Sequence, residues 1–179
     1  EKADAAGYAA GDSEAPSEVA ERGVATLERT EVLAAPVAGR VVDLDQVEDP
    51  VFASKALGEG VAIEPSDGHV TAPVSGLLVT VAENGHAFGL KTDDGVEVLV
   101  HVGFGTAQLA GTYFDLLVTQ HERVEAGDLL AKVDLAGVRA AGCDTTTVVV
   151  VINTMTLTAV NPRKSDTVAL GDPIIDVTP

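Results

Sequence analysis

The sequence predicts an all-β protein: an antiparallel β-sandwich or barrel built on a duplicated hybrid motif, with few short helices. From Glu31 onward, short valine-rich runs are cut by Gly, Pro and Asp about every ten residues, which is typical of strands joined by tight turns. No long helical period is present. Hydrophobic residues make up 46% of the chain but aromatic residues only 3%, so Val, Leu and Ala must supply the volume of the core.

Two internal repeats support a duplicated architecture. APVAGRVV at 35–42 recurs as APVSGLLV at 72–79, and VEAGDLL at 124–130 recurs as VALGDPI at 168–174. Each repeat reads as a tight turn that feeds a strand, with Gly39 and Gly76 expected at positive φ. Gly-Asp pairs mark a second set of turns. The side chains expected to face the core are Val37, Val41, Val74 and Leu78.

Charge and composition exclude several classes of partner. Asp and Glu total 28 against 11 Lys and Arg, a formal net charge of −17, which argues against nucleic acid and anionic membrane surfaces. The longest apolar run, Val148 to Ile152, is far too short for a membrane span, so no direct membrane insertion of this chain is expected. The single cysteine, Cys143, excludes an intrachain disulfide and fits a reducing compartment. We therefore expect a cytoplasmic protein.

The two ends of the chain differ in character. Residues 1–31 are rich in Ala, Glu, Gly and Ser and poor in large apolar residues, so we interpret them as a flexible acidic linker or tail. Residues 32–179 form the predicted domain. The first residue is Glu rather than Met, which suggests a piece of a longer protein. A monomer is the default expectation for the domain.

His86 and His101 lie in a segment that reads as a β-hairpin, with the turn at Thr92-Asp-Asp-Gly95. A two-residue Asp93-Asp94 loop places the two histidines directly opposite each other, and an Asp94-Gly95 loop makes them diagonal neighbours on one face. Only an odd-length loop without a bulge separates them. Two imidazoles followed by a Gly-rich turn suit either a metal ion or a phosphoryl group, and spacing alone equally allows two ordinary hairpin residues.

At this point the motifs are specific. The segments NGHAFGLKTDDGVEVLVHVGFGT at 84–106 and RVEAGDLLAKVDLAGVRAAGCDTTTVVVVINT at 123–154, after the APVAGRVV repeat, resemble the glucose-type enzyme IIA domain of the bacterial phosphoenolpyruvate-dependent sugar phosphotransferase system. The resemblance covers residues 31–179. It implies a cytoplasmic β-sandwich that accepts a phosphoryl group from the phosphocarrier HPr. The domain then passes that group to a IIB domain, which phosphorylates sugar entering through the IIC permease.

The resemblance also assigns roles to single residues. His101 matches the phosphorylated histidine and His86 its partner, which binds the phosphoryl group without being essential for accepting it. Val51 and Phe52 match apolar positions beside the site, and Asp49 matches an acidic position that meets a basic residue of HPr. The positions after the nucleophile, Phe104, Gly105 and Thr106, complete the expected partner-binding set together with Asn84.

Two of these positions depart from the family pattern. Gly105 stands where an aspartate is usual, so a second carboxylate for HPr is absent and docking is expected to be weaker. Asn84 stands where threonine is common two residues before the first histidine, and its amide can still hydrogen-bond that histidine. The AAGCDTTT stretch at 140–147 is more similar to domains fused to β-glucoside, sucrose or N-acetylglucosamine permeases than to the free-standing glucose protein. This resemblance implies a fused permease, which would tether the domain to the inner membrane.

Other functions fit the sequence less well. A lysostaphin-type zinc endopeptidase needs an H-x-H pair, which His101-Val-Gly lacks. A lipoyl or biotinyl carrier presents a modified lysine beside methionine, and neither Lys91 nor Lys132 has that neighbour. A regulatory module that only docks other proteins stays open. No cofactor is expected, and His86 with His101 supplies too few ligands for zinc unless a partner completes the site.

Overall fold

The computed structural model describes residues 29–109 and 111–179, and the predicted linker therefore falls almost wholly outside the described residues. The strands are β1 (Glu31–Ala34), β2 (Gly39–Asp43), β3 (Glu59–Pro65), β4 (His69–Thr71), β5 (Gly76–Val81), β6 (Ala87–Lys91), β7 (Glu97–Phe104), β8 (Phe114–Leu116), β9 (Arg123–Val124), β10 (Leu129–Val133), β11 (Asp144–Val151), β12 (Ala159–Pro162), β13 (Thr167–Val168) and β14 (Pro173–Thr178). The helices are α1 (Pro50–Ala53) and α2 (Leu135–Ala140), with 3-10 turns η1 (Leu44–Gln46), η2 (Thr106–Gln108) and η3 (Thr154–Thr156).

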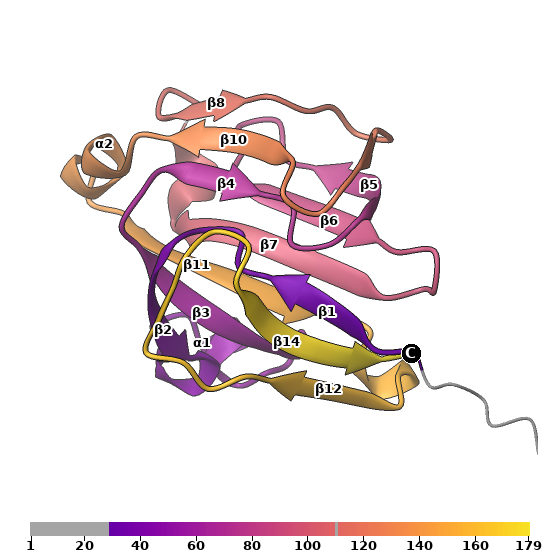
Figure 1. Cartoon of the computed structure of the whole chain (residues 1–179). Helices are drawn as coiled ribbons and strands as arrows, with labels where there is room; N and C mark the ends of the chain where they lie inside the picture. The colour runs from indigo at the N-terminus through magenta and orange to yellow at the C-terminus, as the bar shows by residue number, and fades with distance from the viewer. Residues whose placement is uncertain (1–28, 110) are drawn as a thin grey trace, which may run out of the picture.

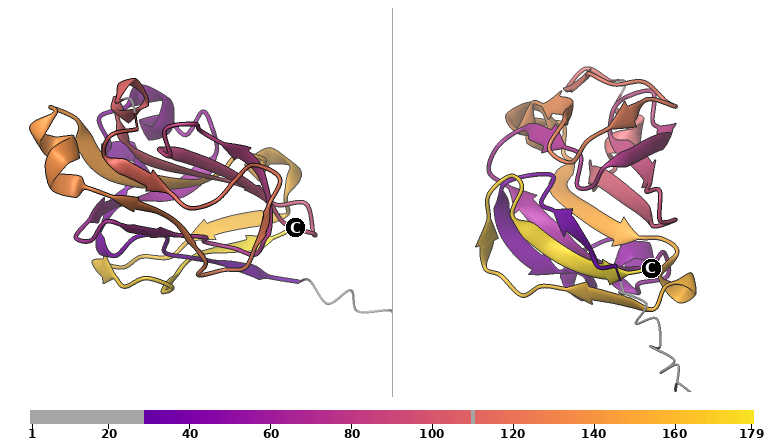
Figure 2. Two further views of the ribbon diagram at one scale, coloured as in Figure 1. Left: turned by 90° about the horizontal axis from the view of Figure 1, so that it is seen from above. Right: turned by 45° about the vertical axis from the view of Figure 1, so that its right-hand side comes forward.

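These strands form one large sheet and two small ones. The large sheet has the order β13-β2-β3-β11-β7-β6-β5-β9, and the small sheets have the orders β1-β14-β12 and β4-β10-β8. Every paired strand is antiparallel to its neighbour. Both small sheets lie over the same face of the large sheet (Figures 1 and 2). The predicted antiparallel β-sandwich with few short helices is confirmed.

The central strands β7 and β11 are covered on both faces, which explains the continuous run of valines at 148–151. Alternate side chains enter the main core between the sheets: Val98, Val100, Val102, Val149 and Val151. The intervening residues Val148 and Val150 pack on the opposite face in a second cluster with Leu44 and Phe52. A strand buried on both sides needs apolar residues at every position. His101 pairs with Val148, so it emerges on the face covered by η1 and α1.

The internal repeats are structurally equivalent. The amide of Ala34 donates to the Pro73 carbonyl at 2.8 Å, and the amide of Thr71 donates to the Pro36 carbonyl at 2.8 Å. The residue before each APV turn therefore forms the same hydrogen bond to the other APV turn. The amide of Ala35 donates to the Asp172 backbone carbonyl at 2.7 Å, and the amide of its counterpart Ala72 donates to the Asp128 backbone carbonyl at 2.8 Å. Each APV turn is therefore tied to one Gly-Asp turn, which confirms the duplication.

The reason for glycine in the APV turns differs from the prediction. Gly76 lies in β5 and does not have the positive φ expected for it. A Cβ atom there would lie 2.4 Å from the Lys91 carbonyl oxygen, and one at Gly39 would lie 1.9 Å from the Glu64 carbonyl oxygen. The neighbouring strand approaches too closely for any side chain. The inward orientation of the apolar residues is as predicted: Val37, Val74 and Leu78 are buried, and Val41 packs against the same core.

No helix in the described part of the chain combines the length and apolar character that a membrane span requires.

Candidate functional site

The hairpin that carries both histidines has a different register from the two that were predicted. Ala87, not His86, pairs with His101, because the loop contains three residues, Asp93 to Gly95. The amide of Gly95 donates to the Thr92 carbonyl, and the amide of Thr92 donates to the Val96 carbonyl. Gly95 has φ of 88°. This is a type I turn followed by a left-handed glycine, the usual three-residue hairpin connection. The prediction of a two-residue loop is wrong.

The two imidazoles nevertheless meet, because His86 lies outside the strand. Strand β6 begins at Ala87, and His86 follows Gly85, which has φ of 78°. The alternation of side chains in a strand therefore does not apply to it. The His86 carbonyl accepts a hydrogen bond from Val102 at 2.7 Å, which holds this residue against β7. The two imidazole centroids are 5.2 Å apart, with the rings almost perpendicular at 81°.

His101 is enclosed by aromatic rings. Its ring centroid lies 5.4 Å from that of Phe52 and 6.3 Å from that of Phe104, which stacks on it at 22°. The two phenylalanines also contact each other at 5.9 Å. The His101 Nδ1 atom is buried against the Gly103 backbone and forms no hydrogen bond of ordinary geometry to a described residue. The structure thus brings Phe52, one of the two predicted apolar neighbours, and Phe104 to the histidine, and it encloses one of the two imidazole nitrogens.

Helix α1 places the predicted acidic and apolar partner-binding residues together. Asp49 is its N-cap, and one carboxylate oxygen accepts from the amides of Val51 at 2.9 Å and Phe52 at 3.4 Å. Pro50 begins the helix, as is favourable at that position. The same short turn therefore buries Phe52 beneath the histidine, leaves Val51 48% exposed and holds the Asp49 carboxylate at the rim.

The loop after β7 supports His86 from the other side. Asn84 Nδ2 donates to the carbonyls of Thr106, Ala107 and Leu109, and Asn84 Oδ1 contacts His86 Nδ1. The buried Thr106 hydroxyl donates to the Val102 carbonyl at 2.7 Å. Thr106 therefore shapes the loop from beneath, whereas Gly105 is exposed with φ of 74°.

Burial lowers the pKa of both histidines below the ordinary value of 6.5. For His86, the charge of His101 acts in the same direction. For His101, the Gly103 backbone and the Asp49 carboxylate act in the opposite direction and offset part of the effect. Both imidazoles are thus neutral at pH 7, and a neutral imidazole has a lone pair with which to attack an electrophile.

These pKa shifts predict how stability depends on pH. Because each folded-state pKa lies below that of the unfolded chain, the unfolded state binds protons first as the pH falls. The free energy of unfolding should therefore decrease as the pH falls below about 6.5. Urea denaturation across this range tests it, and a His86→Gln, His101→Gln double variant should show a shallower decrease. Equal slopes for wild type and the double variant would contradict this prediction.

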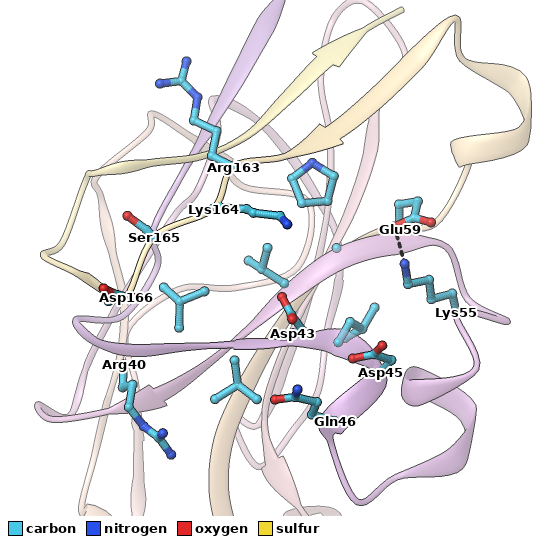
Figure 3. A pocket seen from close by; sticks show the side chains of 16 residues that line it. Arg40, Asp43, Asp45, Gln46, Lys55, Glu59, Arg163, Lys164, Ser165 and Asp166 are labelled. Carbon is cyan, nitrogen blue, oxygen red and sulfur yellow. Dashed lines mark ion pairs between the residues drawn. The ribbon is translucent and has the colours of Figure 1, made fainter.

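Two cavities of similar volume differ in their relation to the histidine pair. One of about 540 Å³ lies between β2 and the segment Pro162–Asp166 (Figure 3). Four basic and four acidic side chains line it, so their formal charges cancel: Arg40, Lys55, Arg163, Lys164, Asp43, Asp45, Glu59 and Asp166. It contains neither histidine. A second cavity of about 560 Å³ opens beside His86 and Asn84 and is also lined by Glu83 and Gly111.

The remaining candidates lie on other elements: His69 begins β4, His121 precedes β9 and Cys143 precedes β11. His69 and His121 are exposed, and Cys143 is partly buried. Within residues 29–109 and 111–179, no three His, Cys, Asp or Glu side chains gather as a metal site would require. Gly103 begins the predicted Gly-rich turn, but the sequence does not reveal its steric role: it has φ of 77°, and a Cβ atom there would lie 2.5 Å from the Asp144 carbonyl oxygen. Only its position two residues after His101 signals it in the sequence.

Comparisons with known proteins agree with this geometry. Residues 31–157 match the family model for the phosphoenolpyruvate-dependent sugar phosphotransferase system, EIIA 1. The glucose-specific EIIA component of Halalkalibacterium halodurans is 44% identical over 123 residues, covering 69% of this chain and 71% of that protein. The solved glucose permease IIA of Mycoplasma capricolum superposes with a TM-score of 0.74 at 38% identity, covering 83% of this chain and 96% of that one.

Other relatives are much longer proteins. The glucose-specific EIICBA component of Streptococcus pneumoniae is 46% identical over 131 residues, which are 73% of this chain but 18% of that protein. A β-glucoside-specific EIIBCA component of Bacillus subtilis is 37% identical over 150 residues, and the chain spans 25% of its length. Free and fused forms thus both occur among the relatives. Sequence, fold and histidine pair agree: the chain belongs to the EIIA 1 family of the sugar phosphotransferase system.

Proposed function

We propose that this chain is a phosphoryl carrier that accepts a phosphoryl group from HPr on His101 and passes it to a IIB domain for sugar uptake and phosphorylation. The observation that carries the proposal is the pairing of His86 with His101, 5.2 Å between ring centroids, with Phe52 and Phe104 packed against His101. Membership of the family supports it. Fusion to a permease, and hence tethering to the inner membrane, belongs to the same proposal.

The geometry supports Nε2 as the reacting atom of His101. Nδ1 is buried against the backbone, so Nε2 is the nitrogen left for a partner. A lowered pKa keeps the imidazole neutral at pH 7, and its lone pair attacks phosphorus while the bond to the donor nitrogen breaks. The phenylalanines exclude water, which protects the phosphoryl group from hydrolysis during transfer.

The surface around His101 suits a transient protein partner with basic residues. Val51 offers an exposed apolar contact, and Asp49 offers a negative charge at its edge. Charge complementarity of this kind speeds association more than it strengthens the final complex. Gly105 adds no side chain, so Asp49 carries more of the attraction here than in domains with a second carboxylate.

The test is intact-mass spectrometry at neutral to alkaline pH after incubation with phosphoenolpyruvate, enzyme I and HPr. The chain should gain one phosphoryl group. If it stays unmodified with cognate and noncognate HPr alike, the carrier function is wrong, and the regulatory docking module becomes the better interpretation.

Replacing Asp49 separates its charge from its role as a helix cap. Asparagine caps a helix as well as aspartate, so Asp49→Asn should leave the urea midpoint unchanged. The rate of phosphoryl acceptance should fall several-fold at low salt, with the difference shrinking as salt screens the charge. Rapid-quench measurements at two ionic strengths test this, with Glu64→Gln as a control at an acidic residue in an ion pair with Arg40. An equal loss in the control would show that Asp49 acts only through net charge.

A further inference from the structure

The side-chain amide of Asn84 is held in one orientation. Its Nδ2 carries two hydrogens and lies within hydrogen-bond distance of three backbone carbonyl oxygens, those of Thr106 at 3.3 Å, Ala107 at 3.0 Å and Leu109 at 3.3 Å. The reversed amide would place Oδ1 against the same three carbonyl oxygens with no donor between them. Because only the NH2 group can donate to these carbonyls, Oδ1 is the atom of the Asn84 amide that contacts His86.

This orientation determines which nitrogen of His86 carries its proton. An amide oxygen can only accept a hydrogen bond, so Nδ1 of His86, which contacts it, must donate. The neutral imidazole is thereby fixed as the Nδ1–H tautomer. Its Nε2 then presents a lone pair rather than a proton.

A lone pair on Nε2 cannot stabilise a phosphoryl group, whose oxygens are also acceptors. We propose that Asn84 is a positioning residue that locks the His86 tautomer, so that phosphorylation of His101 is coupled to uptake of one proton at Nε2 of His86. The inference rests on the proposed carrier function and extends it. His86 then acts as an imidazolium that donates to the phosphoryl oxygens, and it releases the proton when the group leaves.

The charges around His86 support such a switch. In the free protein, burial and the facing His101 keep His86 neutral. Charged groups near the pair include Glu83 in the His86 loop and Asp49, the N-cap of α1. A doubly negative phosphoryl group on His101 reverses this balance, since an opposite charge beside an imidazole favours its protonated form. In the coupled step the His101 lone pair forms the new bond to phosphorus, and the His101 ring gives up its Nδ1 proton. The donor nitrogen regains its electron pair and takes up one proton, so these two changes cancel. The net uptake is the one proton that solvent supplies to Nε2 of His86.

Nitrogen-15 NMR of the histidine rings tests the tautomer directly. In the free wild-type chain, His86 should show a protonated Nδ1 and an unprotonated Nε2 at pH 7. After phosphorylation through HPr, or by phosphoramidate as a small-molecule donor, both nitrogens of His86 should be protonated at the same pH. A free His86 with its proton on Nε2, or a neutral His86 beside phosphorylated His101, would overturn the proposal.

Asn84→Thr is the matched variant, because a hydroxyl can donate to Nδ1 as well as accept from it. The lock is then lost, and a neutral His86 can carry its proton on Nε2. Proton uptake per phosphoryl group, measured in weak buffer with the same donor, should fall toward zero relative to wild type, whereas an altered loop alone would leave the proton count unchanged. If neither donor phosphorylates His101, the carrier function and the coupling fail together, while the free-state tautomer still tests the role of Asn84 by itself.

Discussion

Replacing His101 with alanine should abolish phosphoryl acceptance completely, because among the described residues no other imidazole packs against both Phe52 and Phe104. His86 does not substitute for it, since its Nδ1 is engaged by Asn84 and it lies toward the η2 loop rather than between the phenylalanines. The measurement is intact-mass spectrometry under the conditions that load wild type, with a fixed excess of phosphorylated HPr.

His86→Gln is the matched variant for this experiment. Glutamine keeps a polar side chain beside His101 but cannot become a cation, so the variant should still gain one phosphoryl group and should transfer it to a IIB domain much more slowly. Loss of transfer by about 10²-fold or more is the expected scale for removing a group that stabilises developing charge. A phosphorylated His101→Ala chain, or a His86→Gln chain that transfers as fast as wild type, would show that the two roles are wrongly assigned.

Gly103→Ala should have the largest effect on the site that does not involve a histidine. The backbone has φ of 77°, and an added Cβ atom would lie 2.5 Å from the Asp144 carbonyl oxygen and from Thr106 Cγ2. A left-handed non-glycine residue costs about 1–2 kcal/mol, and overpacking adds a further ~1–3 kcal/mol. Urea denaturation should show the combined loss, together with slower phosphorylation, because the backbone beneath His101 Nδ1 must move.

Gly171→Ala provides the control for the steric part. This glycine has φ of 85°, and no atom lies within 4 Å of the position of an added Cβ. Its substitution should therefore lower the free energy of unfolding by the backbone cost alone and leave phosphoryl acceptance unchanged. If both variants lose the same stability, the close approach of Asp144 to Gly103 has no energetic consequence.

Local patterns in the sequence were sufficient for the strands and the repeats, whereas the assignment of His101 rests on the family resemblance of its motif. Alternation of apolar residues and turn-forming glycines act over a few neighbouring residues, so a single sequence reports them. The register of the β6–β7 hairpin was not predictable in the same way. Thr92-Asp-Asp-Gly95 permits loops of two or three residues, and the three-residue loop is the one that forms.

In the candidate site, too, some features could be predicted from the sequence and others could not. The sequence by itself determined an aliphatic β-sandwich, a duplicated turn motif and a histidine pair in a family-specific context. Only the tertiary structure decided that His86 leaves its strand to meet His101, that Phe52 from a distant helix closes over the ring, and that three carbonyls of the η2 loop orient Asn84. These features depend on contacts between segments that are far apart in the sequence or on backbone angles at single glycines. No local pattern of residues specifies them, since they arise from how the packed sheets bring their loops together.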